Sequence, residues 1–168
     1  GKGLTLGYFA QQELDVLDLQ DTPLSHMVRL AKKVSPQARE QELRNFLGSF
    51  RFPDELAQQK VGTLSGGERA RLVLAMLVWQ KPNLLLLDEP AGGLGAQDIE
   101  WLNGLIRNLK SRTSIIIVEH HMDVVMSVCD RIYVLNFGEI IASGTPEEVR
   151  NNDAVIQAYL GTHSKAQQ

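Results

Sequence analysis

The sequence has a single cysteine and no long hydrophobic run. These two features argue against a disulfide-stabilised protein and against a membrane-spanning one. Cys129 has no second cysteine with which to form an internal disulfide, and such sparing use of cysteine suits a reducing compartment. Apolar runs such as those at 84–87 and 115–118 are far too short to span a bilayer, and the first residues lack the apolar stretch of a secretion signal. We therefore expect a cytoplasmic chain without direct membrane insertion, which would reach the inner face of a membrane only through a partner.

Positive charge is not in excess either. The sequence has 17 Lys and Arg against 20 Asp and Glu, which gives a formal net charge of −3, and the basic residues are dispersed. This balance argues against nucleic acid as a partner recognised through bulk electrostatics. A length of 168 residues with 43% hydrophobic residues is ordinary for one soluble domain with a real core.

A third absence concerns phosphate binding. The 168 residues contain no Gly-x-x-x-x-Gly-Lys-Ser/Thr motif, the loop whose backbone N–H groups and lysine hold nucleotide phosphates. The opening residues GKGLTLG include a Gly-Lys pair, but Gly3 stands where Ser or Thr is needed. We interpret this stretch as the start of a strand.

The order of strand and helix patterns predicts an α/β fold with a parallel sheet. The stretches at 83–90 and 113–121 each contain a continuous apolar run, which is typical of strands buried on both faces. Thr22-Pro23 and Ser35-Pro36 are expected helix starts, because proline is favoured at the first helical position. The predicted elements are strands at 4–12, 83–90 and 113–121, helices within 22–50 and at 66–80, 96–112, 122–130 and 145–161, an irregular connector at 51–62, and a β-hairpin at 131–144 turned at 136–138.

The stretch LSGGE opens the helix expected at 66–80. Ser65 can cap this helix while Glu68 reaches back to it, which is the capping-box pattern. Gly66 and Gly67 carry no Cβ, so a phosphate or another backbone can approach closely. Helix N-termini favour anions, although a capped helix without any ligand is the favoured interpretation of this stretch when it is taken alone.

Two strands end in polar residues. Asp88 and Glu89 follow the run LLLL, at the carboxyl end of a strand where α/β folds bind ligands. The strand ending in Glu119, His120 and His121 repeats this arrangement. For the first strand the alternative is a solvated strand end that Pro90 terminates. For the second strand the alternative is that the two histidines have a structural role.

LSGGE, a strand ending in Asp-Glu and a later strand ending in His occur in the order of ABC-type ATPases, and the chain resembles them from residue 4 to 161. The resemblance implies Mg²⁺ and ATP as ligands. It also implies a P-loop NTPase-like core without the Walker A strand, loop and helix, carrying an α-helical signature subdomain. The implied roles are Q-loop glutamine for Gln11 (with Gln12 as the second choice), which contacts nucleotide and Mg²⁺; nucleotide binding for Ser65, Gly66, Gly67 and Glu68; Mg²⁺ ligand for Asp88; catalytic base for Glu89; and switch histidine for His120.

The same resemblance implies an organisation within one partial domain at residues 1–161. The signature subdomain is expected at 12–80, the Walker B to switch region with C-terminal helices at 81–161, and a frayed tail at 162–168. The role of His121 stays open, because many relatives carry aspartate there. Gly95 replaces a common Asn or Asp in the D-loop, which puts the signalling of that loop in question.

The resemblance differs between the two ends of the chain. Residues 4–90 are similar to the F subfamily of ribosome-associated ATPases, whereas 91–161 are similar to the ATPase subunits of branched-chain amino-acid importers. A join near residue 90, natural or engineered, is one hypothesis for this difference.

We expect the family's function to be ATP hydrolysis coupled to transport, through a second ABC ATPase domain in a head-to-tail dimer and through membrane permease subunits. The 168 residues alone are not expected to hydrolyse ATP at a family-like rate. The alternatives are a fragment of an F-type translation ATPase, a non-catalytic module that supplies only a signature half-site, and a structural chimera without a ligand.

Overall fold

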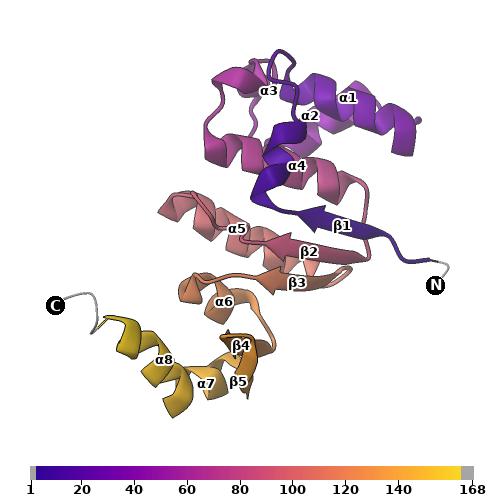
Figure 1. The fold of residues 1–168 in the computed structure, drawn as a ribbon. Coiled ribbons are helices and arrows are strands. Elements are labelled where there is room, and N and C mark those ends of the chain that lie inside the picture. Colours follow the sequence, from indigo (N-terminus) through magenta and orange to yellow (C-terminus); the bar gives the residue numbers. More distant parts are fainter. Residues whose placement is uncertain (1–2, 164–168) are drawn as a thin grey trace. The chain divides into compact units, whose positions relative to one another are not determined.

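The computed structural model describes residues 3–163, without the side chains of Gln11 and of residues 159–163 (Figure 1). Contacts divide the chain into two compact units, residues 1–119 and residues 120–168. The sequence-based division into a signature subdomain at 12–80 and a Walker B to switch region at 81–161 stays a prediction. Of the expected frayed tail, 164–168 lie outside the described residues, whereas 162 and 163 belong to the last helix.

The first unit contains a parallel sheet of three strands, which confirms the predicted fold class. Its strands are β1 (Leu6–Phe9), β2 (Leu84–Asp88) and β3 (Ser114–Val118), in the order β1-β2-β3. In this register Leu6 lies beside Leu84, and Leu84 lies beside Ser114. The carboxyl ends of β2 and β3 therefore meet at one edge, with Asp88 paired to Val118.

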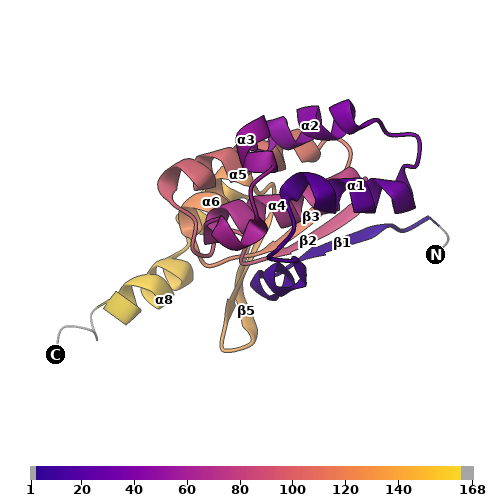
Figure 2. The ribbon, with the colours of Figure 1, turned by 90° about the horizontal axis from the view of Figure 1, so that it is seen from above.

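The α-helices of this unit lie on one side of its three strands (Figure 2). They are α1 (Pro23–Val34), α2 (Glu40–Ser49), α3 (Asp54–Ala57), α4 (Gly66–Trp79) and α5 (Ala96–Leu109). Two short 3-10 helices precede α1 and α4, namely η1 (Gln11–Val16) and η2 (Val61–Thr63). The Thr22 hydroxyl accepts a hydrogen bond from the Ser25 N–H at 3.1 Å, so the predicted start of α1 is confirmed.

Three predicted boundaries are wrong for local reasons. Ser35 ends α1 by donating its N–H to the Ala31 carbonyl, and its own carbonyl closes a turn, so α2 begins only at Glu40. The expected connector at 51–62 contains α3 and η2. The first strand is four residues long and runs directly into η1.

Helix α4 forms the centre of the first unit. It packs against β1, α1 and α2 and buries most of its length, including Leu72, Leu74 and Ala75. Its apolar residues surround the whole helix, as expected for a helix enclosed on several sides.

The expectation that the strands are buried on both faces is wrong. Alternate side chains of the sheet, including Phe9, Leu85 and Leu87, are 1% exposed beneath the helices. The opposite face carries Ile116 and Val118, which are 53% and 54% exposed. The α-helices of this unit cover only one face of the sheet, so the other side of the continuous apolar runs remains accessible.

The second unit combines a β-hairpin with three helices. Its elements are α6 (Met122–Val128), β4 (Ile132–Asn136), β5 (Glu139–Gly144), α7 (Pro146–Arg150) and α8 (Asp153–His163). The strands pair antiparallel around Phe137 and Gly138, both with positive φ, which confirms the predicted turn. A small core of Val125, Ile132, Val149 and Val155 holds this unit together.

None of the helices in the described range 3–163 combines the length and the apolar character that crossing a membrane requires.

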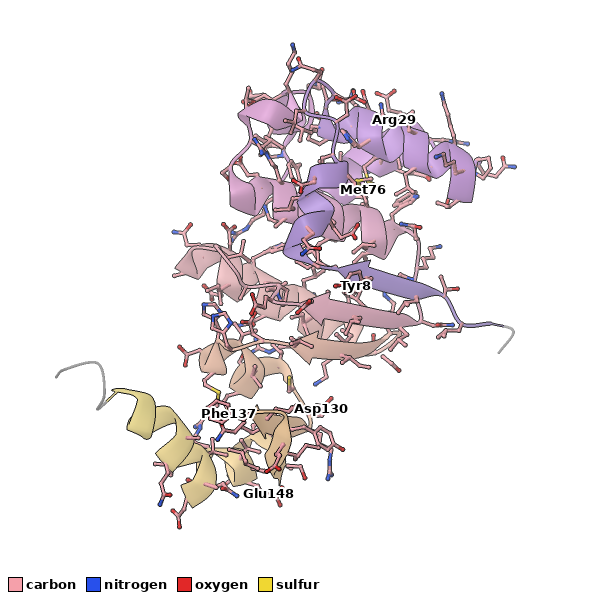
Figure 3. The ribbon with its side chains drawn as sticks, in the orientation of Figure 1. Tyr8, Arg29, Met76, Asp130, Phe137 and Glu148 are labelled. Atoms are coloured by element: carbon pink, nitrogen blue, oxygen red, sulfur yellow. The ribbon has the colours of Figure 1, made fainter. Side chains whose placement is uncertain are left out.

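A pH-dependent contact stabilises the start of α7 in the second unit, where Figure 3 places Glu148. The Thr145 N–H donates to the Glu148 carboxylate, and this bond, and after it the hydrogen bond of the Thr145 hydroxyl, lower the pKa of that carboxyl below its ordinary value. A lowered pKa means that this stabilisation is present above the unfolded value and is lost as pH falls through the folded pKa.

We expect Thr145→Ala to raise the Glu148 pKa part of the way back towards its ordinary value, because the hydroxyl is lost while the backbone N–H remains. An NMR titration of the carboxyl carbon measures this pKa. Thr145→Ser keeps the hydroxyl and serves as the control. An identical pKa in the wild-type chain and the alanine variant would contradict the role assigned to the hydroxyl.

Candidate functional site

The first turn of α4 has the geometry that the sequence predicted. The Ser65 Oγ accepts the Glu68 N–H at 3.2 Å, and the Glu68 carboxylate accepts the Ser65 N–H at 2.7 Å. This reciprocal pair is a capping box, and it fixes Ser65 as the residue before the helix. The helix therefore begins with Gly66 and Gly67, whose N–H groups have no partner within the helix because they lie in its first turn.

The two glycines face different surroundings. A Cβ at Gly66 would meet nothing within 4 Å, so open space lies before this position. A Cβ at Gly67 would lie 3.1 Å from Asp98 Oδ2 and 3.4 Å from Leu94 Cδ2. Gly66 thus leaves room for an incoming group, whereas a side chain at Gly67 would crowd Asp98 and Leu94 near the start of α5.

The end of β2 presents the first acidic residue of the site. Asp88 is half-buried, and the Tyr8 hydroxyl from β1 lies 3.4 Å from its Oδ2 (Figure 3). Desolvation, and after it the negative charge of Asp88, raise the pKa of Tyr8 above its ordinary value. Tyr8 thus stays a neutral hydrogen-bond donor to Asp88 at neutral pH.

Glu89 leaves the sheet with a left-handed backbone. Its φ is +48°, and its N–H donates to the Val118 carbonyl of β3 at 2.8 Å. The Gly92 N–H donates back to the Glu89 carbonyl at 3.0 Å and closes a tight turn. Glu119, at the end of β3, accepts the Ala91 N–H at 3.1 Å and holds this turn against the sheet. These bonds keep the exposed Glu89 at the carboxyl edge beside Asp88.

The left-handed backbone predicts that glycine is favoured over alanine at position 89. A non-glycine residue in this backbone region costs about 1–2 kcal/mol. The free energy of unfolding of Glu89→Gly should therefore exceed that of Glu89→Ala by that amount. Comparing the two variants cancels the loss of the glutamate side chain. Urea unfolding of both gives the difference.

The control is Glu100, an exposed residue within α5. There glycine should be less stable than alanine by about 1 kcal/mol, because helical backbone favours alanine. The same order at both positions would contradict the strain assigned to Glu89.

The residues at this edge fit a hard divalent cation with phosphate ligands. Mg²⁺ binds through one or two carboxylates and completes its shell with water and phosphate oxygens, which a half-buried carboxylate such as Asp88 can support. The backbone of Gln11 begins η1, but its side chain lies outside the described residues, so its role as ligand stays a prediction.

His120 opens the second unit, where its ring lies 4.3 Å from the ring of His121 between centroids. Asp88 and Glu89 belong to the first unit and His120 to the second, and the switch role of His120 stays a prediction.

Several contributors to the site were not singled out from the sequence. Tyr8 lies on a strand whose polar partner is 80 residues away, and Asp98 meets Arg71 of α4 across 27 residues. Glu119 was noted as a strand end, but its bond to Ala91 depends on the register of β2 and β3. Contacts between residues so far apart in the sequence cannot be predicted from a local sequence pattern.

The family models match most of the described chain in two parts. Residues 5–92 match the model described as "ABC transporter", and residues 139–165 match the model described as "Branched-chain amino acid ATP-binding cassette transporter".

Two curated relatives illustrate the similarity. "Probable ATP-binding protein YheS" of Escherichia coli O6:H1 is 42% identical over 136 residues, which cover 80% of this chain and 20% of that protein. LivG of Salmonella typhimurium, a high-affinity branched-chain amino acid transport ATP-binding protein, is 45% identical over 109 residues, which cover 64% of this chain and 43% of LivG. The chain therefore spans less than half of either relative.

Solved structures share the fold. The ATP-binding cassette MJ0796, a dimer bound to ADP and Pi, superposes with a TM-score of 0.70 at 22% identity over 85% of this chain and 63% of that one. The cbiO1 protein of Clostridium perfringens, part of the transporter complex cbiONQ, gives 0.70 at 26% identity over 91% of this chain and 62% of its own.

Proposed function

Since the chain belongs to the ABC transporter family of ATP-binding cassettes, we propose that its α4 turn completes an ATP site held by a second ABC ATPase domain. The observation that carries this proposal is the start of α4. There Ser65 caps the helix, and a Cβ at Gly66 would meet nothing within 4 Å. The Ser65 oxygen accepts from Glu68 but can still donate its own proton to a phosphate oxygen. The N–H groups of the first turn and the positive helix end favour the same anion.

The Glu68 N–H is already bound by Ser65, so the N–H groups of Gly66 and Gly67 are the donors that we assign to the phosphate. Glu68 itself acts in this proposal by fixing the turn.

The edge formed by Asp88 and Glu89 serves a different ATP in the proposal. Asp88 would hold Mg²⁺, and Glu89 would take the proton of an attacking water, while Gln11 and His120 contribute as the family resemblance implies. Mg²⁺, when bound, neutralises phosphate charge. Tyr8 supports this assignment, because its hydroxyl donates to one oxygen of Asp88 and so orients the carboxylate.

The 168 residues contain no phosphate loop of the Gly-Lys-Ser/Thr kind, so this second site is proposed to be inactive in the 168-residue chain by itself. The half-site at Ser65 depends instead on the loop of its partner.

Transport is the process we propose for the whole protein, through permease subunits at the inner face of a membrane and with the chain in the cytoplasm. Both LivG and cbiO1 are transport proteins by name, and the model matched at 139–165 is one of importers. A translation-associated F-type ATPase is the second candidate, which the resemblance of residues 4–90 to that subfamily favours.

The hypothesis of a join near residue 90 has less support. The matches to YheS and LivG, 136 and 109 residues long, are too long to fit on either side of that position, so both run across it. One undivided family sequence predicts this continuity.

The test is an ATP titration of the purified chain, alone and with an ABC ATPase domain such as LivG whose catalytic glutamate is replaced to block hydrolysis. We expect ATP-dependent pairing only with that partner. Robust turnover by the isolated chain that Glu89→Gln abolishes would overturn the proposal, and so would the absence of pairing in both samples.

A further inference from the structure

We propose that Asp98 is a positioning residue that sets the first turn of α4 and couples it to the turn after Glu89. The proposal rests on the proposed phosphate contact at Ser65 and adds a residue to which no role is assigned by the family motifs quoted above.

Asp98 lies on the first turn of α5, directly beside the start of α4. Its Oδ1 accepts Arg71 Nη1 of α4 at 2.5 Å, while its Oδ2 lies 3.1 Å from the Cβ position of Gly67. The same carboxylate therefore binds α4 at Arg71 and occupies the space beside Gly67, one turn earlier. The ion pair fixes the rotation of α4, and a Cβ at Gly67 would crowd the carboxylate that makes this pair.

The ion pair is shielded from water. The Arg71 side chain is 9% exposed and that of Asp98 is 24% exposed, and the guanidinium carbon lies 5.7 Å from the centroid of the Phe52 ring. A pair in such surroundings is stronger than one on the surface, and removing one member leaves the other charge poorly solvated. Arg71 is thereby held in a single orientation by Asp98.

A second arginine completes the cluster. Arg51, which has a left-handed φ of +62°, places its Nη1 3.4 Å from Asp98 Oδ1 and 3.3 Å from the Gln97 carbonyl. Two guanidinium groups against one carboxylate leave the cluster with a net positive charge. The carboxylate thus stands beneath the anion-binding turn without opposing an incoming phosphate.

The loop that carries Asp98 begins at the acidic edge of the sheet. Glu119 holds it at Ala91, and Leu94 Cδ2 lies 3.4 Å from the position that a Cβ of Gly67 would occupy, before α5 begins at Ala96. A displacement of the turn after Glu89 therefore reaches the start of α4 through the bond of Asp98 to Arg71. In the proposed dimer these two segments face different ATP molecules, so Asp98 links one site to the other within a single chain.

The first test is amide hydrogen exchange of the isolated chain with Asp98→Asn. A pair worth about 1.4 kcal/mol should lower the protection of the Glu68 and Arg69 amides about tenfold, with less change at Leu74 and Ala75 in the same helix. The Arg69 N–H donates to the Ser65 carbonyl, so it reports on the turn itself. An equal loss of protection along all of α4 would mean that Asp98 stabilises the whole unit and not this turn. No loss of protection would mean that Asp98 does not position the turn. Either result overturns the proposal.

The control and the partner variant use the same readout. Asp54 also pairs with an arginine, Arg44, but its side chain is 71% exposed, so Asp54→Asn should leave Glu68 and Arg69 unchanged. Arg71→Gln should reproduce the local loss, and the Asp98→Asn/Arg71→Gln double variant should lose no more than either single variant. Additive losses would mean that the two side chains act separately.

The second test measures ATP-dependent pairing with the hydrolysis-blocked LivG domain. Asp98→Asn should weaken pairing about tenfold at temperatures where both proteins are folded, and Asp54→Asn should not. Normal pairing despite the local exchange loss would overturn the coupling. If the wild-type chain does not pair, the proposed function fails, and hydrogen exchange still decides whether Asp98 positions the turn.

Discussion

Replacing Gly67 by aspartate should reduce ATP-dependent pairing by at least about 100-fold, which corresponds to roughly 2.7 kcal/mol. The new Cβ would lie 3.1 Å from Asp98 Oδ2, closer than side chains normally approach, and it would carry a second carboxylate towards the first. Repulsion between like charges at this distance either displaces the start of α5 or turns the new carboxylate outward. An outward carboxylate would stand before the helix end that favours a phosphate, so both responses oppose ATP.

The measurement is the ATP concentration needed for half-maximal pairing with the hydrolysis-blocked LivG domain. Gly104→Asp is the matched control, because Gly104 lies within α5 and a Cβ there meets nothing within 4 Å. Circular dichroism verifies that both variants fold. Pairing within threefold of the wild type for Gly67→Asp would exclude the α4 turn as the phosphate contact.

The second large effect concerns the two faces of the sheet. Leu85→Ala should lower the free energy of unfolding by about 3 kcal/mol, because Leu85 is 1% exposed beneath the helices and its removal leaves a cavity. Ile116→Ala, at a residue 53% exposed on the neighbouring strand, should lower it by less than about 1 kcal/mol. Both changes remove aliphatic carbon, so burial is the main variable that differs.

Urea unfolding followed by the fluorescence of Trp79 and Trp101 measures both values, since both tryptophans lie in the first unit. The slope against urea should be the same for each variant. Equal losses at the two positions would mean that the accessible face is covered in solution. A dependence on protein concentration would identify self-association as the cover.

Local chemistry was predictable from the sequence. The capping box at Ser65 and Glu68, the hairpin turn at Phe137-Gly138 and the carboxylate at the end of β2 each depend on residues close in the chain. The same holds for Thr22 at the start of α1. Short-range preferences decide such features before tertiary contacts form.

Two kinds of feature were not predictable. The start of α2 was misplaced because Ser35 closes the previous helix, a competition that Ser-Pro alone does not reveal. The exposure of β3 was missed because an apolar run does not indicate which of its faces is covered. The ion pair of Arg71 with Asp98 and the bond from Tyr8 to Asp88 depend on long-range packing, which no sequence window contains.

The parallel pairing of β1 with β2 also sets an order of folding. Leu6 can pair with Leu84 only after residue 84 has been synthesised, and the elements from α1 to α4 are synthesised between the two. Contacts of such large sequence separation form late, whereas helices close by local contacts. Helices α1 to α4 can therefore assemble on the ribosome first, and β1 then docks beside β2 once residue 88 has emerged. The apolar side chains of β1 stay unpaired during that interval, which is when a chaperone that recognises extended hydrophobic segments would bind this chain.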